Sequence, residues 1–218
     1  DLPTHVLPKW AGSEERGVWQ ADYLSLQINE VMNFVLDPLL PRIAAMLCGT
    51  NQIRLFHDQL VWKEPIRDVV AKSSVGWHTD RAYWRTCSSK EMLTAWVPLQ
   101  DTDVNMGPLA VWSGSHRWDD TDHLHTFSEE NLTVAAVEFK SPERKVEIES
   151  LPIKKGQVSF HHCRLVHGSY PNLTEHRRMG FAIHYQDSSN RHIGAFKDAP
   201  SSVTHINDVL CRSTPNGY

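Results

Sequence analysis

The chain lacks the apolar run of about 20 residues that a membrane helix needs. Its 218 residues contain no block of lysine and arginine, and the formal net charge is −4. Neither nucleic acid nor a membrane is therefore expected as a partner. Residues 1–5 have neither the basic region nor the apolar core of a signal peptide, so no leader is expected there.

Cysteine is scarce and widely spaced. The four cysteines form no Cys-x-x-Cys pair and stand at positions Cys48, Cys87, Cys163 and Cys211. This spacing argues against a zinc knot or a disulfide framework and favours a reducing compartment, so we expect a cytoplasmic protein. Histidine is abundant instead, with 13 residues, which raises the chance of a metal site and also of false matches.

Apolar residues recur at helical spacing between Asn29 and Leu47, where Pro38 and Pro41 predict a break into two helical pieces and Gly49 predicts the end. Residues 1–25 show no clear pattern, which predicts an irregular start within a helical lead-in to about residue 50. Short runs of strand character follow, separated by turns. They cover residues 53–56 with 60–62, 75–79, 93–99, 109–112, 146–149, 157–160 and 179–185.

Many short strands after a helical start predict a mainly β protein, a double-stranded β-helix (jelly roll, cupin-like) with flanking α-helices. We expect residues 1–218 to form a single catalytic domain, since no repeat or linker interrupts them. Residues 117–145 are polar and weakly patterned, and predict a long excursion that is mobile or covers a site.

His78-Thr79-Asp80 is the strongest chemical signal in the chain. On an extended strand, His78 and Asp80 point to the same face and can bind one metal ion. A second histidine would complete a two-histidine, one-carboxylate set that leaves positions of an octahedral iron open. Taken alone the triplet is a weak signal, because a polar surface strand has the same pattern.

The candidate third ligand is His167, which lies 89 residues after His78 and must come from another strand. Gly168 leaves room for a small molecule beside a metal, and Ser169 supplies a hydroxyl. His161 and His162 are rivals for the same role, or are buried histidines that only form hydrogen bonds.

Arg177 and Arg178 follow, and guanidinium is well suited to hold a carboxylate. One face of the next strand carries Arg178, Gly180, Ala182 and His184, which fits a pocket. The other face is apolar and fits the core, with Met179, Phe181, Ile183 and Tyr185. The alternative for the two arginines is a solvated basic pair.

Four blocks together resemble the phytanoyl-CoA dioxygenase family of Fe(II)/2-oxoglutarate oxygenases, over about residues 30–187. They are residues 56–65, 77–84, 105–109 with 113–116, and 167–178. The resemblance implies His78, Asp80 and His167 as iron ligands. It also implies Arg178 as the 2-oxoglutarate clamp, helped by Ser169, with Trp96 and Gln59 lining the co-substrate pocket.

Two departures from the family pattern stand out. Ser113 replaces a proline, which affects a turn, and the usual N-terminal helical segment is missing, so we expect a chain incomplete at its start. Related halogenases have a small residue where this chain has Asp80. The resemblance therefore implies a hydroxylase rather than a halogenase.

The implied reaction uses Fe(II), 2-oxoglutarate and O2, and oxidises a small-molecule substrate at carbon with succinate and CO2 as co-products. The alternatives are a cupin-like metal enzyme without 2-oxoglutarate and a jelly-roll binding module without metal. We expect a monomer or homodimer. The residues that flank the triplet either line the substrate pocket or pack in the core: Trp77, Arg81, Tyr83 and Trp84.

Overall fold

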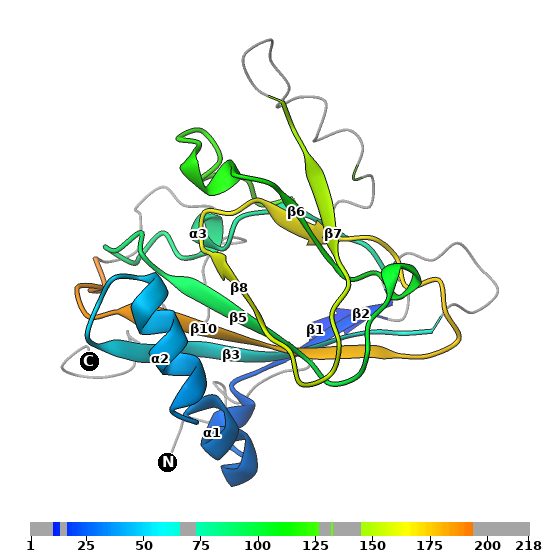
Figure 1. Ribbon diagram of the computed structural model, residues 1–218, viewed down its shortest axis with the longest axis horizontal. Coiled ribbons are helices and arrows are strands. Elements are labelled where there is room, and N and C mark those ends of the chain that lie inside the picture. The colour runs from blue at the N-terminus through cyan, green and yellow to red at the C-terminus, as the bar shows by residue number, and fades with distance from the viewer. Residues whose placement is uncertain (1–10, 14–16, 66–72, 127–131, 133–144, 194–218) are drawn as a thin grey trace.

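The computed structural model describes residues 11–13, 17–65, 73–126, 132 and 145–193. Two antiparallel sheets face each other and form a jelly roll (Figure 1), which confirms the predicted fold class. The six-stranded sheet has the order β1 (Ala11–Ser13), β2 (Val18–Asp22), β3 (Ile53–Lys63), β10 (Arg178–Asp187), β5 (Leu93–Pro98) and β8 (Ser159–His162). The four-stranded sheet has the order β4 (Val75–His78), β9 (His167–Ser169), β6 (Leu109–Trp112) and β7 (Ile148–Leu151).

Two helices cover the outer face of the large sheet, α1 (Asn29–Val35) and α2 (Leu39–Leu47). The predicted break lies at Pro38, the N-cap of α2. Pro41 does not break the helix, because it lies in the first turn of α2. Backbone N–H groups in that turn have no partner within the helix, so a proline there costs no hydrogen bond. The helices pack apolar residues against this outer face of β10 and β5. The resulting cluster includes Val35, Leu40, Ala44, Leu93, Ala95, Phe181, Ile183 and Tyr185.

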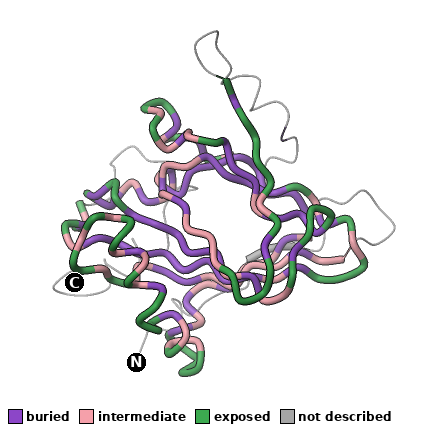
Figure 2. Tube along the Cα trace, in the orientation of Figure 1, coloured by how far each residue is buried: buried purple, intermediate pink, exposed green. Residues whose placement is uncertain are grey.

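Further short elements are the turns of 3-10 helix at Leu24–Leu26, Val104–Met106 and Ser115–Arg117, and the helical turn α3 (Asp80–Tyr83). None of the described helices is long and apolar enough to cross a membrane. Buried residues follow the strands between the sheets, while turns and the outer sides of α1 and α2 are exposed (Figure 2).

Several strand predictions differ from the structure. β3 is continuous over residues 53–63, because β10 pairs with it along its length through one bulge. β7 and β8 each begin two residues later than the alternation predicted. β1 and β2 lie in the stretch predicted to be irregular, and β2 pairs with β3 despite its weak local pattern.

Pairing between β4 and β9 positions the candidate metal ligands. Val75 lies opposite Ser169, and His78 lies opposite His167. The predicted excursion begins over this edge, where Thr79 donates its backbone N–H to the carbonyl of Leu124 at 2.9 Å. Residues 127–131 and 133–144 of the excursion lie outside the described residues.

Candidate metal centre

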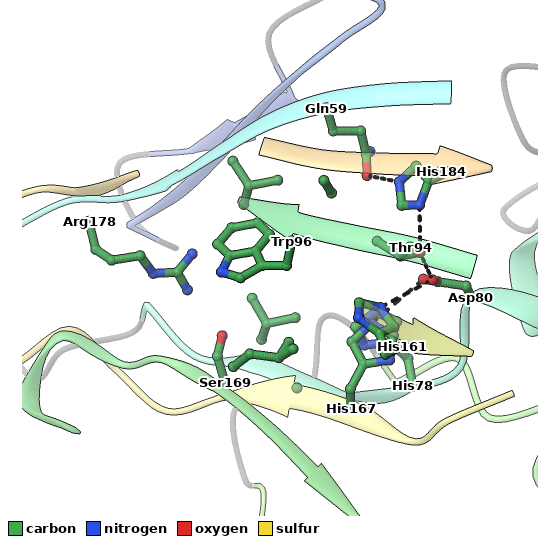
Figure 3. A pocket seen from close by; sticks show the side chains of 15 residues that line it. Gln59, His78, Asp80, Thr94, Trp96, His161, His167, Ser169, Arg178 and His184 are labelled. Carbon is green, nitrogen blue, oxygen red and sulfur yellow. Dashed lines mark hydrogen bonds and ion pairs between the residues drawn. The ribbon is translucent and has the colours of Figure 1, made fainter. Parts of the chain in front are cut away.

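Three buried side chains converge where β4 ends and β9 begins. His78 is the last residue of β4, Asp80 is the first of α3, and His167 is the first of β9. One ligand atom from each lies within 4.8 Å of the other two. Nε2 of His167 is 3.6 Å from Oδ1 of Asp80, and the two imidazole centroids are 4.2 Å apart (Figure 3). The three residues are close enough to share one ion.

The prediction that His78 and Asp80 converge by alternation along one strand is wrong. His78 and Asp80 do not lie on one extended strand, because the strand ends at His78 and the chain turns into α3. Thr79 is the N-cap of that turn, and its hydroxyl accepts the backbone N–H of Ala82. The turn, rather than strand alternation, brings the carboxylate beside the two imidazoles.

Both histidines are oriented by the backbone two residues before them. Nδ1 of His78 lies 2.8 Å from the carbonyl oxygen of Gly76, and Nδ1 of His167 lies 2.9 Å from that of Leu165. A carbonyl only accepts, so Nδ1 carries the proton in each ring. The lone pair of each Nε2 is then available, as a metal ligand requires.

The charge states also suit a metal. Burial lowers the pKa of His78, and burial together with His78 and His161 lowers the pKa of His167 well below its usual value. Burial alone would raise the pKa of Asp80, but His167 and His161 outweigh it, and the pKa falls well below its usual value. At neutral pH the group is two neutral imidazoles and one carboxylate, the forms that bind a divalent cation.

A buried cation lies at the other end of the same cavity. Arg178 is 3% exposed, and its Nη2 donates to the carbonyl of Gly107 at 3.0 Å. Its guanidinium carbon is 5.1 Å from the centroid of the Trp96 ring. Burial lowers the pKa of Arg178 to about 10, so the group stays charged at neutral pH. Its Nε has no hydrogen-bond partner among the described residues, so it can bind an anion.

The cavity between these two ends holds about 570 Å³ of space, counting its open mouth. Its lining is Gln59, Val61, Val75, His78, Asp80, Thr94, Trp96, Leu109, His161, His167, Gly168, Ser169, Arg178, Ala182 and His184. Arg178, Ala182 and His184 therefore face the cavity as their strand pattern predicted. Gly180 makes room for the Trp96 indole, because a Cβ there would lie 2.7 Å from Cη2 of the ring.

A close approach of backbone gives a further reason for a glycine at position 168. A Cβ at this position would lie 2.7 Å from the carbonyl oxygen of Val75 and 3.2 Å from that of Gly76. The glycine thus allows β9 to approach the backbone of β4. Gly168 also lines the cavity, and its role in leaving room for a small molecule beside a metal stays a prediction.

The four residues flanking the triplet do not line this cavity. Trp77 is 1% exposed and donates its indole N–H to the carbonyl of Leu132 at 2.7 Å, while Trp84 is 2% exposed in another apolar cluster. Tyr83 packs at the edge of that cluster. Arg81 donates to the carbonyls of Trp84, Cys87 and Ser89. These placements favour the packing alternative over a substrate-binding role.

Of the rival histidines, His161 lies beside the triad. Its Nε2 is 3.5 Å from Oδ2 of Asp80, and its ring centroid is 4.4 Å from that of His167. His162 points to Glu91 at 3.5 Å and does not line the cavity. Sequence reasoning did not identify Thr94, which contacts Asp80, because nothing in its strand pattern sets it apart.

Comparison with known proteins agrees with this geometry. The family model described as phytanoyl-CoA dioxygenase matches residues 10–180. The chain is 29% identical over 186 residues to the probable alpha-ketoglutarate-dependent hypophosphite dioxygenase of Stutzerimonas stutzeri, covering 85% of this chain and 63% of that protein. It is 25% identical over 165 residues to the peroxisomal phytanoyl-CoA dioxygenase of Bos taurus, covering 75% and 48%. The chain thus spans less than two thirds of the length of either relative.

Solved structures share the fold. The alpha-ketoglutarate-dependent epimerase SnoN from nogalamycin biosynthesis superposes with a TM-score of 0.68 at 25% identity, over 85% of this chain and 69% of that one. The carbocyclase SnoK from the same biosynthesis gives 0.72 at 23% identity, over 97% and 77%. The family match, the fold and the His-Asp-His group agree. The chain belongs to the phytanoyl-CoA dioxygenase family of iron- and 2-oxoglutarate-dependent oxygenases.

Proposed function

We propose that this chain is an Fe(II)/2-oxoglutarate-dependent dioxygenase that hydroxylates, or otherwise oxidises, a carbon of a small-molecule substrate, forming succinate and CO2. One observation carries the proposal. A buried His-Asp-His group and the buried guanidinium of Arg178 face the same cavity from opposite ends. No described carboxylate forms an ion pair with Arg178, so an anionic ligand can fill that role.

His78, Asp80 and His167 would hold Fe(II) on one side and leave its other positions open to the cavity. The iron, when bound, supplies activation of O2 for oxidation of the substrate. Asp80 occupies the position that a halide would need in a halogenase. This supports oxidation without halide.

Arg178 would hold the distal carboxylate of 2-oxoglutarate through two parallel hydrogen bonds. Trp96 keeps the guanidinium in place from one side, and the carbonyl of Gly107 does so from another. Ser169 and Gln59 line the same cavity and offer further polar contacts to the co-substrate. Burial of this end excludes water, which strengthens the charge pairing.

Names of relatives leave the substrate open. They include a hypophosphite dioxygenase, phytanoyl-CoA dioxygenases and a 1-deoxypentalenic acid 11-beta-hydroxylase, while structural neighbours include an epimerase and a carbocyclase. Hydroxylation or another oxidation without halide is proposed because Asp80 completes the ligand set. We further propose that residues 1–218 act as one catalytic domain, since both sheets contribute to the cavity.

The test compares Arg178→Met with Arg177→Met in binding of 2-oxoglutarate to the anaerobic Fe(II) protein by titration calorimetry. Removing a buried partner of a charge pair costs about 2 kcal/mol or more, which is a rise of at least about 30-fold in Kd. Arg177 is half exposed and pairs with Glu64, so its loss should leave the Kd unchanged.

Succinate release after admission of O2 should require both Fe(II) and 2-oxoglutarate in the wild-type protein. Wild-type protein that binds iron without binding 2-oxoglutarate would favour a cupin-like enzyme of another kind. Protein that binds no metal would favour a binding module.

A further inference from the structure

A second basic side chain is buried beside Arg178. Lys63 is the last residue of β3, and its register partner across the sheet is Arg178, the first residue of β10. Lys63 is fully buried and Arg178 is 3% exposed. Among the described residues, no carboxylate forms an ion pair with either side chain. Two basic groups therefore lie together in the interior with no negative charge to balance them.

Backbone carbonyls are the hydrogen-bond partners of the Lys63 amine. Nζ donates to the carbonyl of Ser169 at 3.3 Å and to that of Tyr170 at 2.5 Å, while the Tyr170 ring packs against Trp77. A carbonyl carries no full charge, so these bonds offset only part of the cost of burying an ammonium group. Ser169 lines the cavity and Lys63 does not, which places the amine directly behind the cavity wall.

Arg178 is the charged side chain that acts on Lys63 within the part of the chain that the structure describes. On β2 the register partner of Lys63 is the apolar Val18, and β9 contributes the two carbonyls. Glu64 is next in sequence, but its carboxylate pairs with Arg177 at 3.0 Å. Burial, and secondly the charge of Arg178, hold the pKa of Lys63 well below its usual value. The Lys63 amine is thus the group at this end of the cavity whose charge can change.

We propose that Lys63 is a second, proton-linked cation of the anion site, which takes up a proton from solvent when a carboxylate of 2-oxoglutarate binds at Arg178. The incoming carboxylate supplies the negative charge that the two basic groups lack, and an opposite charge nearby favours the protonated amine. When the carboxylate leaves, the proton returns to solvent. Lys63 does not touch the co-substrate in this role. It acts through its charge and through the backbone of Ser169, and it rests on the proposed function because it requires 2-oxoglutarate at Arg178.

The linkage makes the affinity for 2-oxoglutarate depend on pH. Because the complex holds more protons than the free protein, a rise in pH favours the free protein and raises the Kd. The rise occurs between the pKa of Lys63 in the free protein and its higher pKa in the complex. One linked proton changes the Kd by at most about tenfold per pH unit. The carboxyl groups of 2-oxoglutarate are ionised throughout this range and add no slope.

The experiment is titration calorimetry of 2-oxoglutarate into the anaerobic Fe(II) protein, at matched pH in Tris and in HEPES. These buffers differ in ionisation enthalpy, so the difference in observed heat gives the number of protons taken up. A series between about pH 7 and 9 should show uptake of up to one proton per bound molecule, together with a rising Kd.

Two substitutions of Lys63 separate its charge from its proton. Lys63→Arg keeps a positive charge that does not titrate in this range, so the uptake and the pH dependence of the Kd should both disappear. Lys63→Met removes the charge, and its Kd at about pH 7 should rise to the value that the wild-type protein reaches at high pH. Lys154→Met, at an exposed lysine, should leave uptake and Kd as in the wild-type protein.

Each outcome bears on a different claim. Wild-type protein that binds 2-oxoglutarate without proton uptake at any pH of the series would overturn the role of Lys63 and leave the proposed function standing. Uptake that persists in Lys63→Arg would also overturn it, because the proton would then go to another group. Wild-type protein that binds iron and no 2-oxoglutarate would overturn the proposed function instead. The comparison of buffers uses the wild-type protein, so it decides even where a Lys63 variant does not fold.

Discussion

At the scale of single residues, the two candidate ligand histidines are oriented in the same way. Each is held through Nδ1 by the carbonyl two positions earlier, Gly76 for His78 and Leu165 for His167. This orientation of the imidazole needs only a backbone carbonyl and no partner side chain. It leaves Nε2 of both rings available at the candidate metal centre.

His161 and His167 can be separated by one pair of variants. His167→Ala removes a ligand, and we expect a loss of Fe(II) affinity beyond about 100-fold, more than an outer partner contributes. His161→Ala should lose less than about tenfold, because its 3.5 Å contact with Asp80 is long for a hydrogen bond. Anaerobic calorimetry measures both. The opposite order of effects would make His161 the ligand.

At the scale of elements, the pairing of β4 with β9 is what joins residues 89 positions apart. The pairing is close because Gly168 has no side chain to meet the carbonyls of Val75 and Gly76. The large sheet supplies the opposite wall, with Trp96 on β5 and Arg178 on β10.

Gly168→Ala should force these two strands apart, since the blocking atoms are backbone and cannot rotate away. We expect a loss of about 1–3 kcal/mol in the free energy of unfolding, measured in urea, together with weaker metal binding. Gly156→Ala provides the contrast. Its Cβ meets nothing within 4 Å, so it should affect stability only through its φ of +89° and leave metal affinity unchanged.

At the scale of the whole molecule, the cavity buries several imidazoles in neutral form. Burial lowers the pKa of His184 to about 3, and it also lowers those of His78 and His167. The unfolded chain binds these protons near pH 6.5, whereas the folded chain does not. Between those values the unfolded state gains more protons as the pH falls, so acid favours unfolding.

The metal-free protein should therefore be less stable at pH 5 than at pH 7. His184 alone accounts for roughly 2 kcal/mol of the difference in unfolding free energy. Urea unfolding at both values measures it. His184→Gln should reduce the difference by a similar amount, whereas His123→Gln, at an exposed site, should not. Equal stability of the wild-type protein at the two pH values would contradict the prediction.

The sequence by itself determined the mainly β fold and the inward face of β10, and it predicted the residues of the candidate metal group. These follow from local patterns: alternation along a strand, the short His-x-Asp triplet, and His167 followed by Gly168 and Ser169. A pattern read along the chain is informative when the side chains concerned are neighbours in sequence or alternate in a strand.

Only the tertiary structure decided how Asp80 is presented, what supports it and where the flanking aromatic residues lie. Asp80 sits in a helical turn, Thr94 reaches it from β5, and Trp77 packs into the core. Register between strands far apart in sequence sets these contacts. Hydrogen bonds across such strands leave no periodic trace in the sequence, so the contact between Thr94 and Asp80 could not be predicted from it.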